Sequence, residues 1–159
     1  THNGNVAFTS TSTQGIVGTT TNDSAAAGNV GEFVSAAGAN VAPAGSGTWN
    51  NVASISLTAG DWDVEGTLTF LTHSSFVGTD FRGAISKTSG NTDSIASGGY
   101  FVHSPAPANS TFAHATGTRR ISIASTTTVY LVGQAAYSTL GATTTFVGSS
   151  SFLQARRVR

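Results

Sequence analysis

The stretch Ser54–Thr72 reads Ser-Ile-Ser-Leu-Thr-Ala-Gly-Asp-Trp-Asp-Val-Glu-Gly-Thr-Leu-Thr-Phe-Leu-Thr, and its residues alternate on both sides of the Ala-Gly pair. After that pair, one face of the run carries Trp62, Val64, Gly66, Leu68 and Phe70, and the other carries Asp61, Asp63, Glu65, Thr67 and Thr69. A period of two is typical of a strand with one buried face, whereas a helix needs apolar residues three and four positions apart. We therefore predict a β-hairpin that turns at Ala59-Gly60, where glycine permits the positive φ of a tight turn.

The composition limits the kind of protein that this chain can be. Its 159 residues suit one domain, and only 9% of them are charged, against about 25% in an average soluble domain. Seven acidic and seven basic residues cancel, which argues against nucleic acid as a partner, because that binding needs clustered Lys and Arg. So few charges also favour a surface that is partly covered by other copies of the chain.

Two residue types are missing, and no segment is suited to a membrane. The absence of cysteine excludes disulfides and thiol catalysis. Because methionine is also absent, we expect Thr1 to follow a processed or longer N-terminal part. No apolar run reaches the roughly 18 residues that cross a bilayer, so we expect no membrane insertion, and residues 1–159 contain no pattern typical of a signal peptide.

Alternating runs separated by loops rich in Gly, Pro, Asn and Ser recur along the rest of the chain, and none has a helical period. The predicted strands are Val30–Ala36, Trp49–Thr58, Asp61–Thr72, Asp80–Thr88, Tyr100–His103, Thr111–Ala115, Arg119–Ala124, Thr127–Ser138, Thr145–Val147 and Ser151–Val158. This number of short strands predicts an all-β protein, most simply an antiparallel β-sandwich of the jelly-roll type. An up-and-down barrel and an immunoglobulin-like sandwich are the alternatives. The run Thr127–Ser138 is apolar on both faces, which indicates a strand that is central or buried against another subunit.

Three acidic residues on one face of the long strand are a candidate for chemistry. Asp61, Asp63 and Glu65 are about 6.8 Å apart along the strand, a spacing that an acid pair for glycoside cleavage or part of a Ca²⁺ site can use. An isolated strand cannot wrap an ion, however. We therefore expect a solvated or subunit-facing strand whose acids pair with neighbouring arginines.

Five of the seven basic residues occur in two groups, at Arg119-Arg120 and at Arg156, Arg157 and Arg159. Adjacent residues of a strand face opposite sides, so each doublet places one arginine outward and one inward or toward a neighbour. An inward arginine needs a carboxylate partner. The three acids of the long strand are the expected partners, and we predict at least one such pair.

The four histidines, His2, His73, His103 and His114, have no metal-site spacing, so we predict no metal and no cofactor. The last three fall at strand ends or loops, where they could meet at one end of the sandwich or around a threefold axis. No Gly-x-Ser-x-Gly elbow is present, and we expect no catalytic activity.

Three blocks of the sequence resemble the C-terminal receptor-binding heads of tailed-phage tail fibres and related prophage proteins. The first reads Thr-Asn-Asp-Ser-Ala-Ala-Ala-Gly-Asn-Val-Gly-Glu over Thr21–Glu32, the second Ser-Ile-Ser-Leu-Thr-Ala-Gly-Asp-Trp-Asp-Val over Ser54–Val64, and the third Phe-Leu-Gln-Ala-Arg-Arg-Val-Arg over Phe152–Arg159. The second block is also similar to tumour-necrosis-factor-like and complement-type trimeric jelly rolls. The blocks span most of the chain in the same order.

This resemblance implies a homotrimeric head at the tip of a tail fibre, outside the host cell, that attaches the virion to a cell-surface glycan or protein. Residues 1–22 would be an N-terminal arm or edge strand leading from an upstream shaft, and residues 23–159 the β-sandwich head. Two other classes remain open, namely a carbohydrate-binding module of a secreted bacterial protein and a decoration or structural protein of the virion.

No binding residue transfers from the resemblance, so candidates come from loop position and aromatic content. Exposed aromatic rings beside small polar groups are how proteins stack on sugars. The loops Ala37–Trp49, His73–Asp80 and His103–Phe112 contain the predicted ligand contacts, which are Trp49, Phe76, His103 and Phe112. The alternative for each aromatic residue is that it plugs an end of the sandwich.

Overall fold

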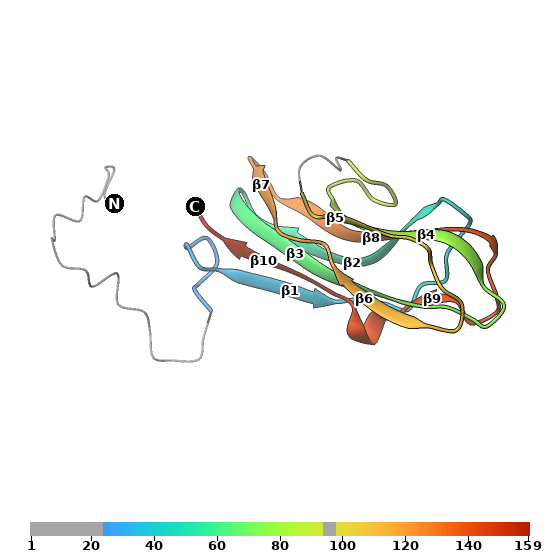
Figure 1. Ribbon diagram of the computed structural model, residues 1–159. Helices are drawn as coiled ribbons and strands as arrows, with labels where there is room; N and C mark the ends of the chain where they lie inside the picture. Colours follow the sequence, from blue (N-terminus) through green and yellow to red (C-terminus); the bar gives the residue numbers. More distant parts are fainter. Residues whose placement is uncertain (1–23, 94–97) are drawn as a thin grey trace, which may run out of the picture.

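Ten β-strands form two antiparallel sheets in the computed structural model, which describes residues 24–93 and 98–159 (Figure 1). The predicted arm at residues 1–22 lies outside the described residues. One 3₁₀ turn at Gly148–Ser150, which we did not predict, is the only helical element described, and no described helix is long and apolar enough to span a bilayer. The prediction of an all-β sandwich is confirmed.

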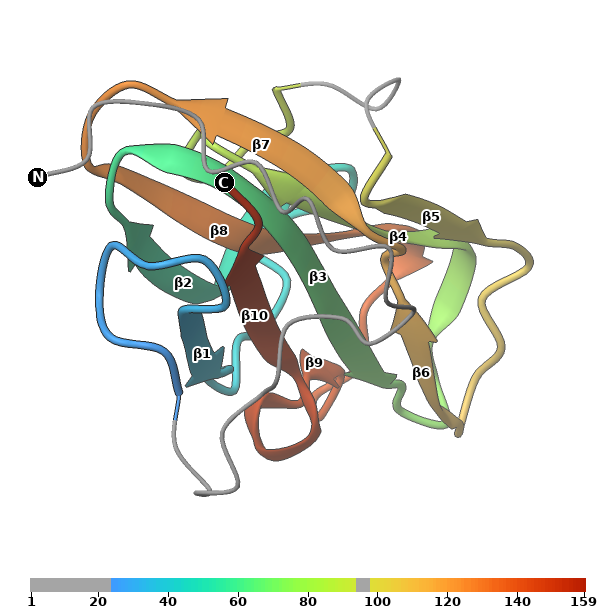
Figure 2. The same cartoon turned by 90° about the vertical axis from the view of Figure 1, so that its left-hand side faces the viewer.

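The first sheet, called the β3 sheet, is built around one long strand. Its strands are β1 (Phe33–Ala37), β10 (Phe152–Arg157), β3 (Gly60–Leu71) and β6 (Thr111–Ala115) in that order, with β7 (Arg119–Ile123) and β9 (Thr145–Phe146) also pairing with β3. The second, called the β8 sheet, has the order β2 (Trp49–Leu57), β8 (Thr127–Thr139), β4 (Val77–Ser86) and β5 (Tyr100–His103). Figure 2 shows β1, β10 and β3 side by side. The predicted strands thus all exist, although β1 begins later than expected and β4 begins earlier.

The pairing of the strands is nested along the chain. β4 pairs with β5, β3 with β6 and β7, β2 with β8, and β1 with β10, all of them antiparallel. Successive strands therefore cross from one sheet to the other, except at the β4–β5, β6–β7 and β9–β10 connections. This is the wrapped double-sheet arrangement of a jelly roll, and it excludes the up-and-down barrel and the immunoglobulin-like sandwich.

The predicted hairpin is wrong, although its two strands and its turn are present. β2 pairs with β8 in one sheet, and β3 pairs with β10, β6, β7 and β9 in the other. Leu57 before the turn and Trp62 after it both point into the core and are fully buried. The chain at Ala59-Gly60 therefore arches from one sheet to the other, because both strands turn an apolar face to the same interior. The indole Nε1 of Trp62 stabilises this arch by donating to the carbonyl of Thr58 at 3.0 Å.

The interior of the sandwich is centred on a phenylalanine of β3. Phe70 stacks on Phe81 of the opposite sheet with ring centroids 4.5 Å apart, and it meets Phe76 edge to face at 5.9 Å. Phe112 and Phe146 lie 5.7 and 5.0 Å from the same ring. Offset and edge-to-face contacts of this kind add to the stabilisation from apolar burial. The buried face predicted for β3 is confirmed.

The two-faced strand is central, which is one of the two positions expected for it. β8 lies between β2 and β4, and its inward residues Val129, Leu131 and Ala135 belong to the core. Its outward residue Val132 is also fully buried, although it lies outside the core cluster. Side chains on the outer face of the β8 sheet therefore cover it within the same chain.

Replacing the central ring by a small side chain should leave a cavity that the surrounding rings cannot fill. We expect Phe70→Ala to lower the free energy of unfolding by about 3–5 kcal/mol in a urea titration. The control Val102→Ala, at a position that is 50% exposed, should change it by less than about 0.5 kcal/mol. A loss below about 1 kcal/mol for Phe70→Ala would show that this ring is not the centre of the core.

Candidate functional site

The four predicted contact residues do not form one site. His103 and Phe112 lie together, with ring centroids 4.8 Å apart. Trp49 lies elsewhere, on the outer face of the β8 sheet beside Tyr100. Phe76 is only 3% exposed and packs in the core against Phe70 and Tyr137, so it offers no ring to a ligand. Phe76 is therefore a ring that fills the interior of the sandwich, which was the alternative to a ligand contact for each aromatic residue.

Trp49 and Tyr100 approach each other across the β8 sheet. They belong to β2 and β5, which are separated by β8 and β4, so their backbones are at least about 14 Å apart at a strand spacing of about 4.8 Å. Their ring centroids are nevertheless 6.5 Å apart. The rings therefore lean over the intervening strands, where Val132 and Ala84 are fully buried between β2 and β5. Both rings remain half-buried, with part of their surface open to solvent.

An ion pair lies on the same outer face. Arg82 donates to Asp80 through Nε at 2.8 Å and through Nη2 at 3.1 Å. The hydrogen bond to Asp80 raises the pKa of Arg82 further above its ordinary value, so the guanidinium stays charged. Gln134 lies between Arg82 and Trp49 in the strand register and donates to the carbonyl of Gly47 at 2.6 Å. We call Trp49, Asp80, Arg82 and Tyr100 the aromatic platform.

The platform combines the two features that carbohydrate sites use. Aromatic rings offer apolar faces to the C–H groups of a sugar, and a charged pair offers donors and acceptors to its hydroxyls. Sequence reasoning found Trp49 but missed the other three residues. The alternation within the strands places them on outer faces, but nothing local indicates that β4 and β5 pair with each other and lie beside β8.

A second group of rings closes the open side of the sandwich. β5 is an edge of the β8 sheet and β6 is an edge of the β3 sheet, and each contributes one phenylalanine and one histidine. His103 and His114 lie 4.7 Å apart between ring centroids, and Phe101 lies 5.1 Å from His114. We call Phe101, His103, Phe112 and His114 the edge cluster.

Of the three histidines that could meet, His103 and His114 lie together, at the edge strands β5 and β6. His73 does not join them, because it lies in the β3–β4 loop, where its Nδ1 and the Ser75 hydroxyl are 2.8 Å apart. His2 lies outside the described residues. Burial lowers the pKa of His114, with a further contribution from His103. The His114 Nε2 atom is buried and has no hydrogen-bond partner. Within residues 24–93 and 98–159, no group of three or more His, Cys, Asp or Glu residues could hold a metal ion.

The acids on the outer face of β3 all have partners. Asp61 pairs with Arg159 and Asp63 with Arg120, each at 2.5 Å, so two of these acids pair with neighbouring arginines as expected, although both arginines are exposed and neither is an inward one. Glu65 accepts a hydrogen bond from Gln154, also at 2.5 Å. Each acid is therefore held by a side chain of a neighbouring segment, and the arrangement resembles neither an acid–base pair facing a cleft nor a calcium loop.

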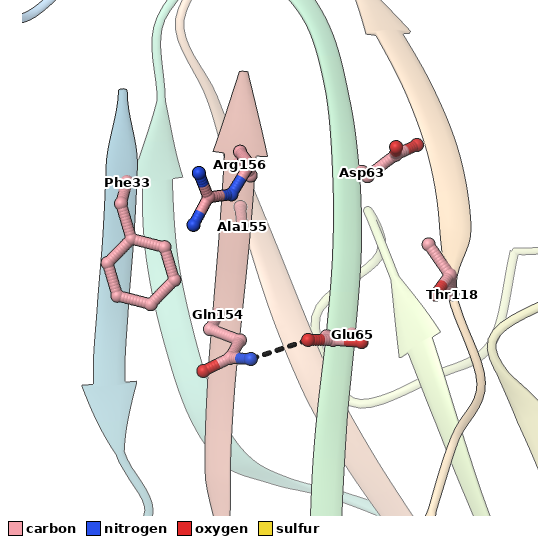
Figure 3. Close-up of a pocket in the computed structure, with 7 residues that line it drawn as sticks. All are labelled: Phe33, Asp63, Glu65, Thr118, Gln154, Ala155 and Arg156. Carbon is pink, nitrogen blue, oxygen red and sulfur yellow. Dashed lines mark hydrogen bonds between the residues drawn. The ribbon is translucent and has the colours of Figure 1, made fainter. Parts of the chain in front are cut away.

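A shallow hollow of about 240 Å³ lies on this outer face (Figure 3). It is lined by Phe33, Asp63, Glu65, Thr118, Gln154, Ala155 and Arg156. The guanidinium carbon of Arg156 lies 5.9 Å from the centroid of the Phe33 ring. Figure 3 shows the Arg156 side chain between Phe33 and β3. The hollow is thus a polar surface on strands, with an aromatic rim.

The inward arginines have different partners from those predicted. Arg119 donates to Asp93 and Arg157 donates to Glu32, at 2.6 and 2.9 Å. The acids of β3 cannot reach them because those acids point away from the interior. Glu32 and Asp93 precede β1 and follow β4, so only the folded chain brings them to the two arginines.

Comparison with known proteins adds no family to this description. No protein-family model matches the chain, and no curated protein is similar to it.

The buried ion pair between Glu32 and Arg157 should make the free energy of unfolding depend on pH. The hydrogen bond from the Gly28 amide, and then that from Arg157, hold the pKa of Glu32 below its ordinary value of 4.5. Ser122 and then Arg159 lower the pKa of Asp61 in the same way. Because the folded chain binds these protons less readily than the unfolded chain, the stabilisation is present above pH 4.5 and is lost as the pH falls through the lower folded pKa.

We expect Glu32→Gln to be less stable than the original chain at neutral pH, because Arg157 loses its buried partner. The difference should shrink as the pH falls below about 4.5, the ordinary value for a glutamate. Urea unfolding at several pH values measures both effects. If the free energies of unfolding of the two proteins changed with pH in parallel down to about pH 2, the role of this pair would be contradicted.

Proposed function

We propose that this chain is the non-catalytic host-recognition head of a phage tail fibre. In this role it assembles as a homotrimer at the fibre tip and attaches the virion to a glycan or protein on the host cell surface. The proposal combines the sequence resemblance with the fold and with two surfaces of different chemistry.

The observation that carries the proposal is where the three resembling blocks lie in the jelly roll. Glu32 of the first block, Thr58 and Trp62 of the second and Arg157 of the third are in direct contact. Blocks that are far apart in the sequence thus form one structural unit. These contacts agree with a resemblance that extends over the whole domain, because three segments that match by chance would not be expected to lie in contact with one another.

The outer face of the β3 sheet has the features of a contact between copies of the chain. Phe33 and Phe152 are 37% and 40% exposed on it. Asp63 is paired with Arg120, and Glu65 with Gln154, so covering this face leaves few polar groups without partners. Interfaces of oligomers are enriched in aromatic residues and poor in unpaired charges.

The aromatic platform lies on the opposite sheet and supports the receptor-binding part of the proposal. A single such surface binds a sugar weakly, but three copies on one head act together on a crowded cell surface. The platform also favours a second candidate, a carbohydrate-binding module, which would act as a monomer with one platform.

Solution mass separates these two candidates. Light scattering on a gel-filtration column, at two concentrations, should give a stable mass near three times 16.0 kDa. We expect Phe152→Lys to lower this mass, because it places a charge in the proposed contact. Val77→Lys, at a position that is 58% exposed on β4, is the matched control and should remain trimeric. A clean monomer of the original chain would contradict the fibre head and favour the module.

Binding to a glycan array and to a panel of labelled bacterial cells tests the platform. Trp49→Ala and Tyr100→Ala should each weaken binding by about 2 kcal/mol, or roughly thirtyfold, as is usual for an aromatic residue at the centre of a contact. His73→Ala, at a position in the β3–β4 loop outside the platform, should bind as the original chain does. Unchanged binding by both platform variants would contradict the site. No binding by the trimer to any glycan or cell would favour a decoration protein.

A further inference from the structure

We propose that His103 and His114 form a binding site for one divalent transition-metal ion, for which Zn²⁺ and Ni²⁺ are suitable probes. The site would link β5 of the β8 sheet to β6 of the β3 sheet. It is independent of receptor binding and of the number of subunits.

The separation of the two rings fits one shared ion. A zinc–nitrogen bond is about 2.0–2.1 Å long, so two imidazoles on one ion have centroids about 4.5–5.2 Å apart at the bond angles of ordinary coordination. His103 and His114 have centroids 4.7 Å apart. The rings therefore already have the spacing of a two-histidine chelate. Sequence spacing does not reveal this, since the residues lie on strands of different sheets.

An unsatisfied nitrogen indicates that the site is incomplete. The Nε2 atom of His114 is buried without a hydrogen-bond partner. Most buried polar atoms of proteins have partners, and an exception calls for an explanation such as a water or an ion. An ion bound at this nitrogen would give it a partner.

The walls of the site restrict how the two imidazoles can move. Phe112 stacks on His103 at 4.8 Å with an angle of 23° between the planes, and Phe101 packs against His114. Rings held in this way lose little freedom when an ion binds, which favours affinity. The phenylalanines also supply no competing ligand atoms.

The donor set selects the class of ion. Imidazole nitrogen suits zinc, nickel and copper, whereas magnesium and calcium prefer oxygen. The described residues provide only two ligands here, because no group of three or more candidate ligands exists among them. Water would complete the coordination, so we expect modest affinity and an ion that exchanges with solvent.

The proposal predicts a specific stabilisation. An ion that binds only the folded chain raises its melting temperature, and the stabilisation grows with the logarithm of the free ion concentration once this exceeds the dissociation constant. After treatment with a chelator and dialysis, the full chain is titrated with zinc chloride in a calorimeter and melted at each zinc concentration. We expect one ion per chain and a rising melting temperature. Magnesium chloride should cause neither effect.

Matched variants locate the ion. His103→Gln and His114→Gln should each weaken zinc binding by at least about 10- to 100-fold. A loss of this size is seen even when the residue removed only hydrogen-bonds to a metal-binding side chain. His73→Gln, in the β3–β4 loop, should bind zinc as the original chain does. Each variant is compared with its own metal-free melting temperature, so a loss of stability does not imitate a loss of binding. The ring protons of His103 and His114 should also shift in the NMR spectrum when zinc is added.

Two results would overturn the proposal. One is the absence of both binding heat and thermal shift at zinc concentrations up to about 1 mM, the limit of weak specific affinity. The other is zinc binding that persists in the double variant His103→Gln/His114→Gln. Neither result bears on the tail-fibre proposal, which is tested by mass and by cell binding.

Discussion

The buried guanidinium of Arg157 holds together the end of the sandwich at which three segments meet. It donates to Glu32, to the Thr58 hydroxyl and to the carbonyl of Ala59, and its carbon lies 4.4 Å from the Trp62 ring. A buried arginine is costly unless its donors are satisfied, and here the carboxylate, the backbone and the aromatic face all contribute. The close approach also constrains the turn, because a Cβ at Gly60 would lie 2.0 Å from the Arg157 Nη1 atom. The arch between the sheets, the last strand and the segment before β1 are thus fixed by one side chain.

This constraint explains why the recognisable parts of the sequence say little about a ligand. The three resembling blocks meet around Arg157, where they specify how the sheets join. The aromatic platform and the edge cluster are built instead from β2, β4, β5 and β6, which lie largely outside those blocks. Structural and surface residues are therefore separated in the chain, and the resemblance concerns mainly the structural ones.

The strands were predictable because each depends on local alternation. β5 and β6 have the predicted bounds, and β3 has the predicted buried face. Partners were harder to predict, because pairing depends on contacts between distant residues. The Ala59-Gly60 turn fits a hairpin as well as an arch, and only the shared interior for Leu57 and Trp62 distinguishes the two. The partners of Arg119 and Arg157 were missed for the same reason, since Asp93 and Glu32 are distant in sequence.

The amino-acid pattern alone established the class of fold, the two-sided character of β3, the burial of β8 on both faces and the inward–outward split of each arginine doublet. These properties follow from the period of two and from the cost of burying charge, which act along a single strand. The folded chain was needed to show which strands are neighbours. That step removed Phe76 from the candidate contacts, added Tyr100 and Arg82 beside Trp49, and placed His103 against His114. Such neighbours are set by the nested pairing of a jelly roll, in which residues far apart in the sequence share a face or an edge.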